Sequence, residues 1–106
     1  MMTLQTTVDL MTSADYKDRF KAEYWQLKIR YEKLKAFNTK IEAAMLSKRE
    51  HYNDDSVAIK DTPKHDCPAE LLCEQQNIMG NYLHTLEVRA VFENIDLTEV
   101  PHETQK

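Results

Sequence analysis

Turn-forming residues are almost missing from this chain, which has one glycine and three prolines among its 106 residues. Strands joined by tight hairpins need such turn residues, so a fold rich in β-structure is excluded. Two cysteines, Cys67 and Cys73, are too few for a disulfide scaffold. We find no apolar run long enough to span a bilayer and no secretory signal pattern at the start. The composition predicts a soluble, single-domain, all-α protein.

Charge is distributed unevenly along the chain. The net charge is −4, which argues against a non-specific nucleic-acid-binding protein. Residues 13–50 carry ten Lys and Arg against six Asp and Glu, a balance of +4, and the rest carries four against twelve, a balance of −8. A basic helix packed near acidic segments would explain this pattern, and a basic surface that binds an anionic ligand is the alternative.

Residues 13–50 contain neither Gly nor Pro and predict one long helix, with Thr12 and Asp15 as a capping box at its start. Apolar residues recur in steps of four and three, the spacing of a coiled-coil seam. The seam consists of Phe20, Tyr24, Leu27, Tyr31, Leu34, Ile41 and Met45. Asn38 occupies the slot between Leu34 and Ile41, where a polar residue typically fixes the register of the helices.

A second apolar stripe lies on the same helix, away from the seam. It consists of Ala22, Trp25, Ile29 and Ala36. One partner helix cannot cover both stripes along about 55 Å of helix, so Trp25 and Ile29 predict contact with another protomer.

The remaining segments complete a helical hairpin. Residues 1–12 form a leader, 51–66 a mobile loop, 67–94 a second helix with Pro68 in its first turn, and 95–106 a tail. Gly80 in the middle of the second helix indicates either a close approach by a backbone or ligand, or a neutral exposed site.

We therefore predict one domain over residues 1–106, a long antiparallel, coiled-coil-like hairpin that assembles into an oligomeric helix bundle. Two helices of unequal length with excess apolar surface bury too little area in so small a domain, so a homo-oligomer is expected, most simply a dimer forming a four-helix bundle. The expected interface residues are Trp25, Ile29, Tyr82 and Leu86.

Catalytic chemistry is not indicated, because we find no Gly-rich phosphate loop and no nucleophile beside a positioned histidine. His65, Cys67, Cys73 and His84 do not follow the paired spacing of structural zinc sites. The prediction is a protein that is not an enzyme and has no metal or cofactor.

An anion-binding surface is the candidate site. Tyr24 and Tyr31, beside Lys28 and Lys35, bring aromatic faces and ammonium groups together, and Arg89 could complete the site across an oligomer interface. The alternative is that both tyrosines are core residues. In that case the lysines would pair with carboxylates of the second helix, namely Glu70, Glu74 and Glu87.

Two runs carry a resemblance to known proteins: Y-K-x-R-F-x-x-E-Y-x-x-L at Tyr16 to Leu27 and Q-x-x-x-M-x-x-Y-L-x-x-L-E-x-R-A at Gln75 to Ala90. The chain is similar to small helical-hairpin proteins of crAss-like and related phages. Its second run also resembles the hairpin domain of phage sponges that sequester cyclic nucleotide signals of CBASS and Thoeris immunity.

The resemblance implies a phage protein in the cytoplasm of an infected bacterium that antagonises host defence. Its expected partners are copies of itself and a cyclic nucleotide signal, with no membrane involved. Two alternatives stay open: an anti-CRISPR-type inhibitor that binds a Cas effector by protein–protein contact, and a structural phage hairpin without a ligand.

Overall fold

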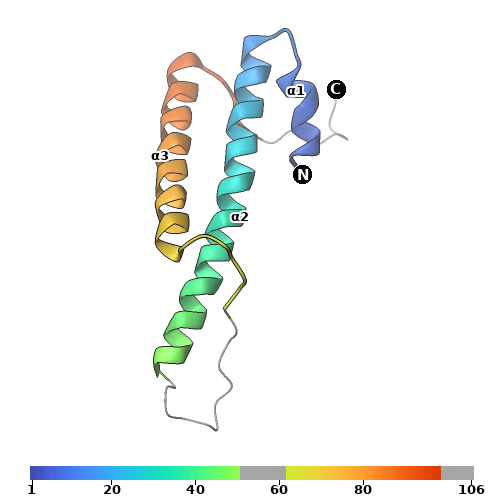
Figure 1. Cartoon of the computed structure of the whole chain (residues 1–106). Coiled ribbons are helices and arrows are strands. Elements are labelled where there is room, and N and C mark those ends of the chain that lie inside the picture. The colour runs from blue at the N-terminus through green and yellow to red at the C-terminus, as the bar shows by residue number, and fades with distance from the viewer. Residues whose placement is uncertain (51–61, 99–106) are drawn as a thin grey trace.

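The computed structural model describes residues 1–50 and 62–98. Two antiparallel helices, α2 (Tyr16–Glu50) and α3 (Ala69–Glu93), form a hairpin. A 3₁₀ turn, η1 (Gln5–Thr7), and the short helix α1 (Val8–Met11) precede it and lie beside the first half of α2 (Figure 1). The described residues contain no strand, so the predicted all-α hairpin is confirmed.

The start of α2 is capped by Asp15 and not by the predicted pair of Thr12 and Asp15. Asp15 Oδ1 accepts a hydrogen bond from the backbone N–H of Lys17 at 3.0 Å. Ser13 adds a second link by donating its hydroxyl to Asp18 at 2.8 Å. The hydroxyl of Thr12 bonds back to Val8 of α1 instead, so Thr12 belongs to the preceding helix and α2 begins later than predicted.

The ends of α3 are set by Pro68 and Asn94. Pro68, predicted in the first turn of this helix, is instead its N-cap, so α3 begins later than predicted. The Pro68 carbonyl accepts hydrogen bonds from the backbone N–H groups of Leu71 and Leu72. Asn94 adopts the left-handed conformation at φ 58°, and Ile95 N–H bonds to the Ala90 carbonyl at 2.8 Å. This is a Schellman motif. It turns Ile95, which is 6% exposed, into the core.

The predicted seam forms most of the contact between α2 and α3. The core cluster consists of Phe20, Tyr24, Leu83, Leu86, Ala90 and Ile95, with Leu27 and Tyr31 packed against it. Ile41 and Asn38 are also buried. The prediction is wrong for Met45, which is 57% exposed. Helix α3 begins only at Ala69, so the last turns of α2 extend beyond it (Figure 1).

The first residues of the chain lie against the second stripe of α2, where another protomer was predicted. Ala22 is 1% exposed, and Gln26 donates a hydrogen bond to Thr7 of η1 at 2.9 Å. Thr7 is itself fully buried. Residues 1–12 thus fold back on their own α2, and the second stripe alone does not require a second chain.

The other predicted segments are described only in part. Residues 51–61 of the predicted loop and 99–106 of the predicted tail lie outside the described residues. Residues 62–68 have no helical structure and contact α2, through a hydrogen bond from Lys48 to Thr62 and an edge-to-face contact between Phe37 and His65. Within the described residues, none of the helices has the length and apolar character needed to cross a membrane.

Gly80 faces an aromatic ring of the opposite helix. A Cβ built on Gly80 would lie 3.4 Å from Cε1 and 3.6 Å from the hydroxyl oxygen of Tyr31. The close approach is therefore made by a side chain of α2, and not by the backbone or ligand that the sequence suggested. These separations are ordinary van der Waals contacts, so the ring leaves room for a methyl group.

The substitution Gly80→Ala is expected to stabilise the hairpin. Alanine is favoured over glycine in a helix interior by about 1 kcal/mol, and the added methyl would contact Tyr31 without overlap. Thermal unfolding followed by circular dichroism would show a higher midpoint. A lower midpoint would mean that the added methyl group overlaps with a Tyr31 ring that cannot move. In that case, adding Tyr31→Leu to Gly80→Ala should raise the midpoint again.

Candidate functional site

Tyr24, the first residue of the predicted anion-binding surface, is a core residue. It is 7% exposed and packs edge-to-face against Trp25, with ring centroids 5.4 Å apart. Its hydroxyl donates to Glu87 of α3 at 3.4 Å, a long hydrogen bond. Burial, and then the negative charge of Glu87, raise the pKa of Tyr24. The ring is not available to stack on a ligand.

The other three predicted α2 residues do not converge with Tyr24. Tyr31 is half-buried beneath Gly80. Lys28 forms an ion pair with Glu32 of its own helix at 3.6 Å, and not with a carboxylate of α3 as the alternative interpretation predicts. Lys35 lies at the rim of a groove further along α2.

Arg89 lies near the end of α3, beside the start of α2 and away from Lys35. Its guanidinium lies over the ring of Phe20, 4.8 Å from the centroid. It also donates to the Tyr16 hydroxyl at 2.5 Å and pairs with Glu93 at 3.3 Å. Through these contacts Arg89 links the start of α2 to the end of α3. The five predicted ligand residues therefore do not form one site within the chain.

The four predicted interface residues differ in accessibility. Leu86 is fully buried in the core between α2 and α3, so it is not exposed for a second chain. Trp25 and Ile29 are half-buried. Tyr82 is 44% exposed and donates a hydrogen bond to Glu23. Tyr82 is the most exposed of the four, and Ile78, four residues earlier on α3, is exposed to 59%.

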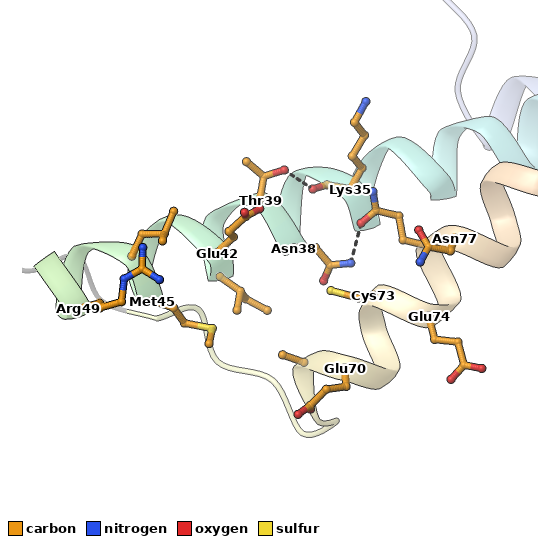
Figure 2. A pocket seen from close by; sticks show the side chains of 14 residues that line it. Lys35, Asn38, Thr39, Glu42, Met45, Arg49, Glu70, Cys73, Glu74 and Asn77 are labelled. Atoms are coloured by element: carbon orange, nitrogen blue, oxygen red, sulfur yellow. Dashed lines mark hydrogen bonds between the residues drawn. The ribbon is translucent and has the colours of Figure 1, made fainter.

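A groove lies where α2 continues past the first turns of α3, and it is the strongest candidate for a ligand site (Figure 2). Its volume is about 1040 Å³. Small-molecule sites usually have volumes of about 300–1,000 Å³ and mostly apolar walls with a few polar groups. The wall from α2 includes Asn38, Ile41, Met45 and Arg49, and the wall from α3 includes Ala69, Cys73 and Gln76.

Asn38 is the polar group at the base of this groove. Its amide nitrogen donates to the Leu72 carbonyl at 3.1 Å and to Gln76 Oε1 at 2.9 Å. Because a carbonyl can only accept, these bonds fix the orientation of the carboxamide. The amide oxygen, on the other side, is buried and has no hydrogen-bond partner in the described residues. In Figure 2 it points into the space between α2 and α3.

Charged side chains surround the groove without giving it a single sign. Lys35 and Arg49 come from α2, and Figure 2 shows Lys35 extending away from α3. Three carboxylates, Glu42, Glu70 and Glu74, also line it. The groove is therefore not the uniformly basic surface that the charge balance of residues 13–50 suggested.

The cysteines and histidines are not gathered into a metal site. In the described part of the chain, no three His, Cys, Asp or Glu side chains are placed to hold a metal ion. Both cysteines are reduced and exposed; Cys73 borders the groove and Cys67 does not.

Sequence reasoning identified Asn38 as a register residue but did not place it in a site. The usable signal was the unequal length of the two predicted helices, which leaves the end of α2 without a helix opposite. The seam prediction includes Asn38, Ile41 and Met45, and it expects a partner helix to cover all three.

The stability of the protein is expected to fall with rising pH partly through Tyr24. Its pKa is raised above 10.0 in the folded chain, so the folded state keeps this proton when the unfolded state loses it. The contribution is complete below the unfolded pKa and is lost as pH rises through the folded one. Tyr24→Phe should flatten the fall of the thermal midpoint above about pH 10. Equal slopes for both proteins would contradict this.

A family model described as Sequestin matches residues 14–92, which include most of the hairpin. No curated protein matches the chain, and no solved structure does. The match covers well over half of the sequence and extends from just before α2 to the last turn of α3. The chain therefore belongs to the Sequestin family.

Proposed function

We propose that this protein is a non-enzymatic phage protein that antagonises bacterial defence by binding and sequestering a nucleotide immune signal. The observation that carries the proposal is the family match over the hairpin, since the family name denotes sequestration. The groove between α2 and α3 supports it, because its volume suits a small nucleotide.

Sequestration needs affinity and abundance but no reaction. A binding protein lowers the free signal when its own concentration exceeds that of the signal and its dissociation constant lies below the signal concentration. A constant of about 1 μM corresponds to about −8.2 kcal/mol, which one groove with several polar contacts can provide.

Oligomerisation is a second part of the proposal. On α3, Leu71, Ile78 and Tyr82 follow one another at seven and four residues and are 53%, 59% and 44% exposed. Such a stripe on a helix surface is typical of a protein contact. A second copy of the chain is the occupant we favour, because each copy presents the same stripe and a two-fold interface is self-complementary.

Contact with a host protein is the competing function, and the same exposed side chains favour it. An anti-CRISPR-type inhibitor would use this stripe, with Val91 and Phe92 at 80% and 87% exposure, against a Cas effector. Co-purification of the effector with this protein, and loss of nucleic-acid cleavage in its presence, would identify that function.

Calorimetry with cyclic di- and trinucleotides and cyclic ADP-ribose isomers tests the sequestration proposal. At least one compound is expected to bind with a dissociation constant of about 1 μM or lower, and to be recovered chemically unchanged after the protein is denatured. Absence of heat from every compound would contradict nucleotide sequestration. Recovery of a converted compound would contradict a non-enzymatic role.

Light scattering tests the oligomer. The chain has a mass of 12.5 kDa, and we expect a particle of at least twice that mass. Ile78→Lys places a charge in the exposed stripe and should lower the mass toward 12.5 kDa. His84→Lys adds the same charge at another exposed position of α3 and should leave the mass unchanged. A wild-type monomer would refute the oligomer.

A further inference from the structure

We infer that the groove between α2 and α3 binds the nucleoside end of the signal, a base with an exocyclic amine and its ribose, with Asn38 as the acceptor for that amine. This inference rests on the proposed function and assigns it a place in the chain. It differs from the surface formed by Tyr24, Lys28 and Tyr31, of which Tyr24 is buried, Lys28 is paired with Glu32 and Tyr31 is packed against Gly80.

The hydrogen bonds of Asn38 leave the groove with an acceptor that has no donor in the described residues. Both hydrogens of its amide nitrogen are directed to Leu72 and Gln76. The amide oxygen can still accept a hydrogen bond, and only 7% of the Asn38 surface is exposed. A buried acceptor without a donor costs free energy, and a ligand that supplies an N–H removes that cost. The free group therefore selects a donor and disfavours a phosphate.

The apolar walls suit a flat ring. Ile41 and Ala69 come from opposite helices and border the same groove as Asn38. Met45 is 57% exposed, and its unbranched, polarizable side chain can reorient as a heterocycle enters. A base would thus bury apolar area while its amine reaches the amide oxygen.

The charges of the groove favour the ribose over the phosphates. Glu42, Glu70 and Glu74 can accept hydrogen bonds from ribose hydroxyls and would repel phosphate groups. Arg49, at the far end of α2 from Asn38, and Lys35 at the rim are the cations that border the groove. Phosphates are therefore expected at the edges of the groove, beside one or the other of these two side chains.

The two cysteines provide a built-in assay, because one borders the groove and the other does not. Two variants of the full chain, Cys67→Ala and Cys73→Ala, would each be alkylated with iodoacetamide. Because each variant keeps one thiol, its alkylation rate reports on that thiol alone. Adenosine at saturating concentration is expected to slow alkylation of Cys73 about fivefold or more and to leave Cys67 unaffected. Inorganic pyrophosphate should protect neither thiol.

Two comparisons then test Asn38. Purine riboside, which lacks the exocyclic amine of adenosine, should bind about five- to tenfold more weakly, the effect of one hydrogen bond. Asn38→Leu should abolish this difference between the ligands and weaken adenosine binding by the same factor. Leucine is a normal seam residue, so the thermal midpoint of this variant should equal or exceed that of the wild type.

Control substitutions separate the groove from general charge effects. Lys35→Ala should weaken binding of the cyclic nucleotide that responds in calorimetry more than binding of adenosine. Lys40→Ala removes the same charge from an exposed position of α2 outside the groove, and its binding should match the wild type.

The outcomes distinguish this inference from the proposed function. If a cyclic nucleotide binds but neither it nor adenosine protects Cys73, sequestration stands and the groove assignment is wrong. Protection by pyrophosphate alone would make the groove an anion site and overturn the nucleoside assignment. If purine riboside binds as tightly as adenosine, Asn38 only fixes the helix register. If no nucleotide or nucleoside binds, both proposals fail.

Discussion

The register between α2 and α3 depends on Asn38. Its amide nitrogen donates to the backbone of α3 at Leu72 and to Gln76, and a shift of either helix by one residue would break both bonds. With this register, Tyr31 lies against Gly80 and Leu86 enters the core beside Tyr24. The oxygen of the same carboxamide, at the base of the groove, has no hydrogen-bond partner among residues 1–50 and 62–98. One side chain thus both fixes the packing of the two helices and supplies a buried polar atom to the groove.

Much of the fold could be predicted from the order of residues. The steps of three and four from Phe20 to Ile41 indicated the helix face that α3 covers, because a buried seam requires that period. The scarcity of glycine and proline excluded a fold rich in β-structure for an equally direct reason, since tight hairpins need such residues. The boundaries were less certain, since Thr12, Ser13 and Asp15 can all cap a helix and only the positions of the backbone N–H groups decide among them.

The candidate site could not be predicted in the same way. Periodicity states which side of α2 is apolar, but it does not state what covers that side. Residues 1–12 cover part of the face on which Ala22 lies, whereas Met45 is 57% exposed and has no helix of the described part of the chain opposite it. Tyr24 and Arg89 have the residue types of an anion site, yet their hydrogen-bond and ring partners come from the same chain. Whether a side chain is available to a ligand depends on which other segments of the chain pack against it. The pattern of one helix does not specify those segments.

The extension of α2 beyond α3 also has a consequence for local stability. Residues 46–50 are helical, but α3 does not pack along them, so they depend largely on the hydrogen bonds of their own helix. This end of α2 should therefore unfold locally more often than the part of α2 that packs against α3. Amide hydrogen exchange detects such local unfolding. Arg49 lies in this segment, and its contact with a bound phosphate would order it. The affinity of the protein would then include the free energy of completing its own helix.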